Sequence, residues 1–238
     1  MSDAGLWVNF IEYVQREYVQ ILLLTWEHIF ISFVALIITI AICVPTGIYL
    51  TRNERLAPYV IGLANIFETI PSLALLGFLM FVVGIGKDNA IIALVLYAML
   101  PVIQNTYTGI KSVSESLIEA GRGVGMTEFQ ILRLVQLPLA RPVIVAGIRV
   151  AAVWIIGTAT LAAAIGGGGL GRLIFSGISA VRDEVILAGA LPATILALLV
   201  DQLLKYLQET ASPQRRVARL NRKMEKKLMT EGKETIKA

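Results

Sequence analysis

The chain has 238 residues and a formal net charge of +4, and 56% of its residues are hydrophobic. Its mean hydropathy is +0.74. Because soluble domains are only about 45–50% apolar, this composition predicts an integral membrane protein and excludes a soluble globular fold. The single cysteine, Cys43, lies in an apolar stretch, which excludes an intrachain disulfide and a cysteine metal cluster.

The N-terminal segment is less apolar than the stretch from residue 29 onward. Residues 7–24 mix polar and apolar side chains, which predicts a helix lying in the membrane interface. The alternative is that this helix extends the first membrane span outward. We assign residues 1–28 to an outer N-terminal segment, and we expect His28, beside Glu27, to lie at the membrane interface.

Five apolar stretches approach the length of about 20 residues that a helix needs to cross a bilayer core. They occupy residues 29–50, 59–83, 90–109, 143–165 and 185–204. The second stretch contains Pro71, which lacks a backbone donor and disfavours helical geometry at Ile70, so we predict a break there. A break at membrane depth must face protein or a wet cavity. The sequence therefore predicts an all-α transmembrane domain over residues 29–208.

Basic residues are distributed unequally between the loops. One side of the predicted membrane receives Arg52, Arg55, Lys111, Arg122, Arg133, Arg141 and the C-terminal tail; the other receives only Arg16, Lys87, Arg172 and Arg182. Because basic residues accumulate on the cytoplasmic side, we predict an outer N-terminus and an inner C-terminus. The basic tail, residues 209–238, is predicted to bind anionic lipid or to sense ionic strength.

A glycine-rich stretch, GGGGLGRL over residues 166–173, partly matches nucleotide-binding motifs. A P-loop requires Lys and Ser or Thr at its end, but Arg172 and Leu173 stand there, and no strand precedes the glycines. We therefore predict an outer turn, followed by an amphipathic helix over residues 170–178. The turn is either a plain flexible loop or part of an outer gate that includes Gly168.

The longest predicted inner loop, residues 111–138, has the pattern of two short helices around a glycine turn. Ser112 with Glu115 fits a capping box for the first helix, and Thr127 with Gln130 fits one for the second. These caps predict that each helix begins directly after its serine or threonine.

The same loop carries a glycine cluster and an apolar stripe. The glycines are Gly121, Gly123 and Gly125, and they favour positive φ or a close crossing of the two helices. The stripe consists of Phe129, Leu132 and Val135, spaced for one face of a helix. That face must pack on the bundle or on a partner.

The pattern E-A-G-x3-G-x9-V-Q-L-P, from Glu119 to Pro138, resembles the EAA loop of bacterial ABC importer permeases. Gly121 replaces the second alanine of that motif and Val135 replaces an isoleucine. The resemblance implies a type I importer fold of five spans, in which two permease subunits pair. It also implies that each loop docks on a separate ATPase, so that ATP and magnesium are bound by that partner and this chain has no cofactor or metal of its own.

Position by position, the resemblance assigns roles within the loop. Glu119, Ala120 and Gly121 would end the coupling helix, Gly125 would make the turn, and Val135, Leu137 and Pro138 would close the motif. A rigid helix held in a cleft transmits rigid-body motion to the spans at its ends.

Four further stretches are similar to the osmoprotectant permeases of the Opu type: TWEHIFIS, ETIPSLALLGFL, GIGKDNAIIALVLYAMLPVIQNTYTGI and IGGGGLGRLIFSGI. The resemblance implies a subunit of the bacterial cell membrane that imports glycine betaine, carnitine or choline by alternating access. It implies two ATPase subunits, a second permease that is the same or a similar chain, a separate outer binding protein, and no nucleic acid. The alternative is a type I importer of other cargo, such as an amino acid.

Ionisable and aromatic residues within the spans are candidates for the translocation path or gate. Glu68 and Arg149 fall at similar predicted depths in the membrane, so they could form an ion pair. The alternative partner of Arg149 is Asp201, near the inner end of the last span. Tyr97 and Trp154 offer aromatic faces that suit a quaternary ammonium group. An intramembrane enzyme would need a nucleophile and base, or paired carboxylates, at one depth, and the sequence offers no such set.

Overall fold

The computed structural model describes residues 3–211, and within that range the chain forms helices and turns without strands. The elements are α1 (Asp3–Arg52), α2 (Ala57–Thr69), α3 (Ser72–Val83), α4 (Lys87–Lys111), α5 (Glu115–Gly123), α6 (Glu128–Ile131), the π-helix η1 (Leu132–Gln136), α7 (Leu137–Ala159), the 3₁₀-helix η2 (Thr160–Ile165), α8 (Gly171–Ala180) and α9 (Asp183–Ala211). The all-α prediction is confirmed. The predicted basic tail lies almost entirely outside the described residues.

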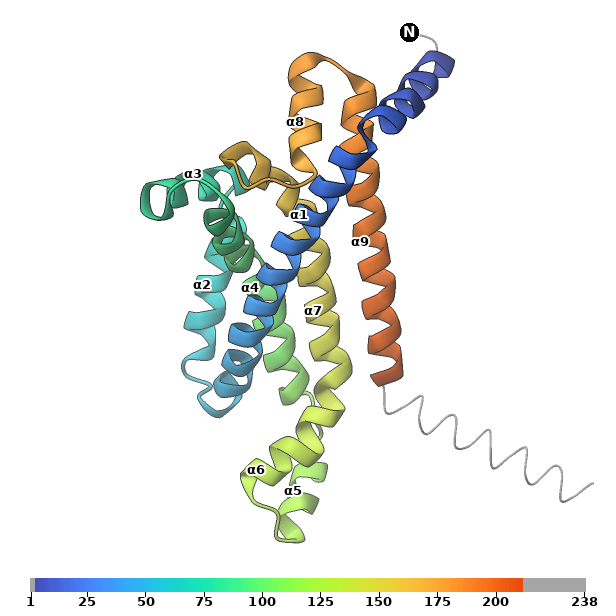
Figure 1. Cartoon of the computed structure of the whole chain (residues 1–238). Helices are drawn as coiled ribbons and strands as arrows, with labels where there is room; N and C mark the ends of the chain where they lie inside the picture. Colours follow the sequence, from blue (N-terminus) through green and yellow to red (C-terminus); the bar gives the residue numbers. More distant parts are fainter. Residues whose placement is uncertain (1–2, 212–238) are drawn as a thin grey trace, which may run out of the picture.

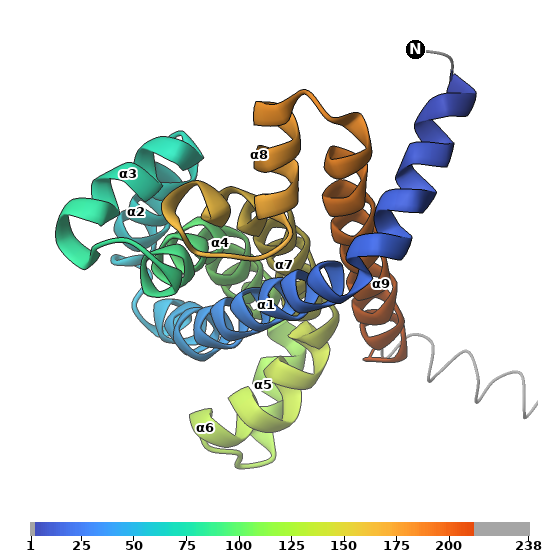
Figure 2. The ribbon, with the colours of Figure 1, turned by 45° about the horizontal axis from the view of Figure 1, so that its top comes forward.

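The long helices run side by side, and the short ones gather at the two ends. In Figure 1 α5 and α6 lie at one end of the molecule, beyond the ends of α4 and α7, whereas α3 and α8 lie at the opposite end. In Figures 1 and 2 α8 folds back beside the start of α9. The α5–α6 end and the α3–α8 end are therefore structurally distinct.

Four helical segments among the described residues are long and apolar enough to cross a membrane, or five if the bent pair α2 and α3 forms one crossing. That pair bends by 103°. Ile70 has extended φ/ψ of −67° and 130° directly before Pro71, so the predicted break is confirmed. With 13 residues, α2 is about 20 Å long, which is shorter than a bilayer core of about 30 Å. Five crossings and an outer N-terminus stay predictions.

The N-terminal segment continues the first predicted span. α1 runs unbroken through residues 28 and 29, with one non-helical residue, Glu17, at φ −113° and ψ 19°. Its N-terminal half packs through the buried Leu24 onto Leu170, Leu173 of α8 and Val185 of α9. Residues 18–24 are therefore continuous with the first predicted span, whereas residues 7–16 precede the kink at Glu17, and their position at the membrane interface stays a prediction.

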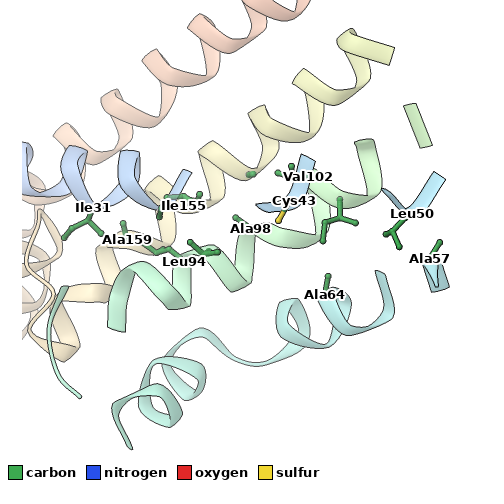
Figure 3. Close-up of a cluster of buried hydrophobic side chains, with 14 residues drawn as sticks. Ile31, Cys43, Leu50, Ala57, Ala64, Leu94, Ala98, Val102, Ile155 and Ala159 are labelled. Carbon is green, nitrogen blue, oxygen red and sulfur yellow. The ribbon is translucent and has the colours of Figure 1, made fainter. Parts of the chain in front are cut away.

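The core lies where α4 packs between α1 and α7. Figure 3 shows Ala98 and Val102 of α4 beside Cys43 of α1, and all three side chains are fully buried. A Cβ atom on Gly147 of α7 would lie 2.6 Å from the carbonyl oxygen of Pro101 on α4. Glycine is required at this crossing because two backbones approach closely.

We expect Gly147→Ala to lower the free energy of unfolding by about 1–3 kcal/mol, because the added methyl group overpacks the crossing of α4 and α7. The measurement is thermal unfolding of the purified protein in detergent. Gly62→Ala on α2 is the matched control, since a Cβ there meets no atom within 4 Å. Equal unfolding temperatures for the two variants would contradict the close approach.

Candidate functional site

The predicted coupling loop, residues 111–138, projects from one end of the helices (Figure 1). Glu119 and Ala120 are exposed, whereas Gly121 is buried. A Cβ on Gly121 would lie 3.2 Å from Cγ1 of Ile131. Gly121 therefore brings α5 against α6, and the exposed side of α5 is left for a partner.

The turn of this loop depends on Gly125. Its φ is +81°, a conformation that favours glycine. The amide of Gly125 donates to the carbonyl of Arg122 at 2.9 Å, and the amide of Met126 donates to the carbonyl of Gly121 at 3.0 Å. The predicted positive φ is confirmed at Gly125 but is absent at Gly121 and Gly123.

One predicted capping box is confirmed and the other is wrong. The amide of Gln130 donates to Thr127 Oγ1 at 3.3 Å, and the amide of Thr127 donates to Gln130 Oε1 at 2.8 Å. Ser112, by contrast, caps the end of α4 by donating from Oγ to the carbonyl of Gly109 at 2.9 Å. Because α4 extends to Lys111, Ser112 is not available to begin α5.

Ion pairs connect the coupling loop to the end of α1. Arg52 donates from Nη1 to Glu128 Oε2 at 2.9 Å and from Nη2 to the Glu128 carbonyl at 2.9 Å. Arg122 donates from Nε to Glu128 Oε1 at 2.8 Å, and this hydrogen bond raises the pKa of the Arg122 guanidinium above its usual range. Lys111 also binds Glu54, in the connection between α1 and α2, at 2.6 Å.

The role of Glu128 was not visible in the sequence, because an acidic residue directly after an N-cap is common in any helix. Only the basic residue at the end of α1, Arg52, hints at a distant partner.

The apolar side chains of the loop divide into two groups. Leu132 and Leu137 pack against Ile110 and Ala140 at the base of α4 and α7. Phe129 is 67% exposed and Val124 is 76% exposed. Of the predicted stripe, Leu132 therefore rests on its own bundle, whereas Phe129 is exposed, as is the neighbouring Val124.

The glycine-rich stretch at residues 166–171 is held by α1 and α4. Gly168 and Gly169 have φ of +88° and +76°. The Gly169 amide donates to Glu27 Oε2 at 3.2 Å, and Lys87 Nζ lies 3.2 Å from Glu27 Oε1. A Cβ on Gly168 would lie 2.5 Å from Glu27 Oε2. These contacts favour a structured turn over a plain flexible loop, and the gate remains a prediction.

His28 does not lie at the membrane interface as expected. It is fully buried, and its Nε2 lies 3.0 Å from the carbonyl oxygen of Ile156 on α7. Gly169 packs directly on its ring, since a Cβ there would lie 3.0 Å from Nδ1. The interface prediction is wrong because the glycine turn covers this side of α1.

The helix break uses Tyr97 to satisfy its backbone. The Tyr97 hydroxyl donates to the carbonyl of Ile70, which the extended backbone before Pro71 takes out of the helical hydrogen-bond pattern. Nearby, Glu68 Oε2 is buried with no hydrogen-bond partner among residues 3–211. Within the same range no cluster of three or more His, Cys, Asp or Glu could hold a metal ion.

Arg149 of α7 pairs with Asp201 of α9 and not with Glu68. The guanidinium Nε and Nη2 lie 2.5 Å and 2.8 Å from the two carboxylate oxygens. Trp154, which is 41% exposed, lines the same groove between α7 and α9. The structure thus brings together Arg149 and Trp154 and leaves Glu68 and Tyr97 at the helix break.

Comparison with known proteins gives one family and several close relatives. Residues 43–213 match the family described as binding-protein-dependent transport system inner membrane component. The chain is 46% identical over 205 residues to the choline transport system permease protein OpuBB of Bacillus subtilis (strain 168), covering 86% of this chain and 94% of the relative. It is 47% identical over 194 residues to the glycine betaine/carnitine/choline transport system permease protein OpuCB of the same organism, covering 82% and 89%.

The fold is also similar to that of a solved transporter. A chain of the inward-facing MetNI methionine ABC transporter superposes with a TM-score of 0.70 at 27% identity, covering 79% of this chain and 94% of that chain.

We expect Gly125→Ala to open the coupling loop, because a methyl group at φ +81° costs about 1–3 kcal/mol of backbone strain. Trypsin cleavage after the exposed Arg122 in the purified protein should accelerate about five- to 150-fold, because each 1.4 kcal/mol changes the open population about tenfold. Gly123→Ala is the matched control, because neither glycine has an atom within 4 Å of its would-be Cβ and only Gly125 has positive φ. Cleavage at the same rate in both variants would contradict the strained turn.

Proposed function

The chain belongs to the family of binding-protein-dependent transport system inner membrane components, and from that membership we propose that it is the permease subunit of an ATP-driven importer of osmoprotectants. The single observation that carries this conclusion is the 47% identity, across 82% of the chain, to a glycine betaine/carnitine/choline permease. The cargo is a small quaternary ammonium compound of the bacterial environment. The protein resides in the bacterial inner membrane and is not itself an enzyme.

ATP is bound and hydrolysed by separate subunits that dock on the coupling loop. Support comes from the projection of α5 and α6 beyond the other helices (Figure 1) and from the exposed Phe129 and Val124. The full assembly contains two ATPase subunits, two permease subunits and an outer substrate-binding protein. The α5–α6 end of the chain faces the cytoplasm, and the N-terminus faces outward.

Motion of the coupling loop reaches the membrane helices by a short route. α6 continues through the π-helix η1 directly into α7, and π-helical turns recur at functional sites. Glu128 ties the loop to α1 through Arg52. A displacement of the loop by the ATPase therefore moves α7 and α1 together, which is a rigid-body route to alternating access.

The translocation path runs along the side of α7 and α9 that α1 does not cover. Two cavities of about 320 and 350 Å³ adjoin each other along these helices and share Val153 and Asp201 in their linings. Ionisable residues at membrane depth almost always face a bundle interior or water. The partly exposed pair of Arg149 and Asp201 therefore belongs on a wet path and not against lipid.

The proposed function is tested by uptake of labelled glycine betaine, carnitine and choline into vesicles that hold the full assembly. We expect accumulation that requires ATP and the binding protein. Uptake of none of the three, together with uptake of an amino acid such as methionine, would reassign the cargo. The fold similarity to a methionine transporter makes this the second candidate.

Gly125→Asp tests the coupling role. We expect the variant to assemble in the membrane and to lose at least about 90% of uptake. The substitution adds a charge to the docking surface and places a side chain on a residue with positive φ. Ser179→Asp is the matched control, since it adds the same charge to an exposed position of α8 at the other end. Normal uptake by the assembled Gly125→Asp variant would refute the coupling role.

A further inference from the structure

The groove between α7 and α9 has a charged half and an apolar half. The charged half, a cavity of about 320 Å³, is lined by Arg149, Trp154, Asp201 and Gln208 together with small apolar side chains. The adjoining cavity is lined mainly by apolar residues, with Thr160, Thr194 and the shared Asp201. A cavity of this size lies within the range that small-molecule sites occupy, about 300–1,000 Å³. The polar groups are thus concentrated at one position along the groove.

The ion pair at this position is accessible and electrically balanced. Its side chains are 30% and 25% exposed for Arg149 and Asp201, respectively. Among residues 3–211, Glu209 acts electrostatically on Arg149 and Lys205 acts on Asp201, so the charges of these four side chains sum to zero. A ligand that binds here without changing the net charge of the site must be neutral overall.

Trp154 lies five residues beyond Arg149 on α7, about 7.5 Å along the helix axis. Its ring is 41% exposed and lines the same cavity as the ion pair. A methylated ammonium group cannot donate a hydrogen bond, and it is held best by an aromatic face, tryptophan above all. An anion site and a cation site therefore line one groove, separated by about 7.5 Å along the axis of α7.

We propose that this cavity is a binding site within the membrane for zwitterionic quaternary ammonium carboxylates. The ligand carboxylate binds the Arg149 guanidinium, and the trimethylammonium group lies on Trp154 with the Asp201 carboxylate as its counter-charge. A zwitterion inserted in this way gives each charge of the protein pair a new partner and leaves the groove neutral. Choline carries the same ammonium group but no carboxylate, so it adds an uncompensated positive charge and leaves Arg149 without a new partner. This inference rests on the proposed function and adds where and how the cargo is recognised.

Substrate discrimination tests the proposed site. In the full assembly, Arg149→Gln is expected to lower the ratio of betaine to choline uptake, as kcat/KM, by about tenfold or more, because only betaine loses a charge-assisted contact. Trp154→Leu is expected to lower uptake of both substrates about fivefold, whereas Trp154→Phe retains an aromatic face and stays closer to the wild type. An unchanged ratio in Arg149→Gln, or equal effects of leucine and phenylalanine at position 154, would overturn the assignment.

Direct occupancy is measured with a thiol reagent, which keeps the test decisive if a variant cannot transport. The sole native cysteine of this chain, Cys43, is buried, so a cysteine introduced at Val150, which lines the cavity, is its one accessible thiol, and its modification is measured on the separated permease subunit. Glycine betaine should slow its modification in the full assembly about threefold or more at saturating concentration, choline should protect less, and modification of the control Ser179→Cys should not change. Equal protection by both compounds, or none, would overturn the site.

The proposed function and the proposed site fail differently. Absence of ATP-dependent uptake of all three compounds by the wild-type assembly refutes the proposed function. Normal wild-type uptake with an unchanged betaine-to-choline ratio in Arg149→Gln refutes only the site.

Discussion

Close packing of α4 between α1 and α7 is the interaction on which the remaining structure depends. Two glycines permit it: Gly147 lets α7 approach Pro101 and Asn105, and Gly47 of α1 faces Thr106 with no room for a Cβ. In a membrane, helices gain little from the hydrophobic effect, so van der Waals contact between small residues must hold them together. With α4 fixed against both neighbours, α1 covers one side of the bundle. The groove between α7 and α9 is left on the other.

The two ends of the molecule use the same device for different loops. At one end Glu128 of the coupling loop accepts from Arg52 at the end of α1; at the other, Glu27 of α1 accepts from Gly169 of the glycine turn. The Arg52–Glu128 ion pair is exposed and contributes at most about 1 kcal/mol, and the contact at Glu27 is a single hydrogen bond from a backbone amide. The value of these contacts lies in their position, because they join both loops to one helix, α1.

The groove shows why a membrane protein retains charges that cost stability. A partly exposed pair such as Arg149 and Asp201 gains little over apolar packing and would be costly against lipid. It is reasonable only where water or a polar ligand reaches it. The groove combines this ion pair with the indole of Trp154 and with an apolar continuation past Val153. Such a surface favours a compact zwitterion, which carries one positive and one negative charge.

The sequence by itself determined the features that depend on near neighbours in the chain. Hydropathy revealed the membrane helices, Pro71 located the break, and the turn chemistry of Thr127 and Gly125 set the start and hinge of α6. The coupling motif, from Glu119 to Pro138, indicated the family without any structure. Each of these signals spans a few residues, because helix periodicity, caps and turns are governed by atoms three or four positions apart.

Only the tertiary structure decided the contacts between distant segments. Sequence left Arg149 with two possible partners, and the rotation of α7 against α9 selected Asp201. The sequence predicted that His28 lies at the membrane interface, whereas the glycine turn buries His28 against α7. The sequence also suggested an aromatic role for Tyr97 but did not reveal that the Tyr97 hydroxyl binds the free carbonyl at the helix break. The depth of a residue follows from its position in a span, but its neighbours follow from how each helix is rotated and where it crosses the next. Those angles are set by side-chain packing over the whole interface, which no local pattern encodes.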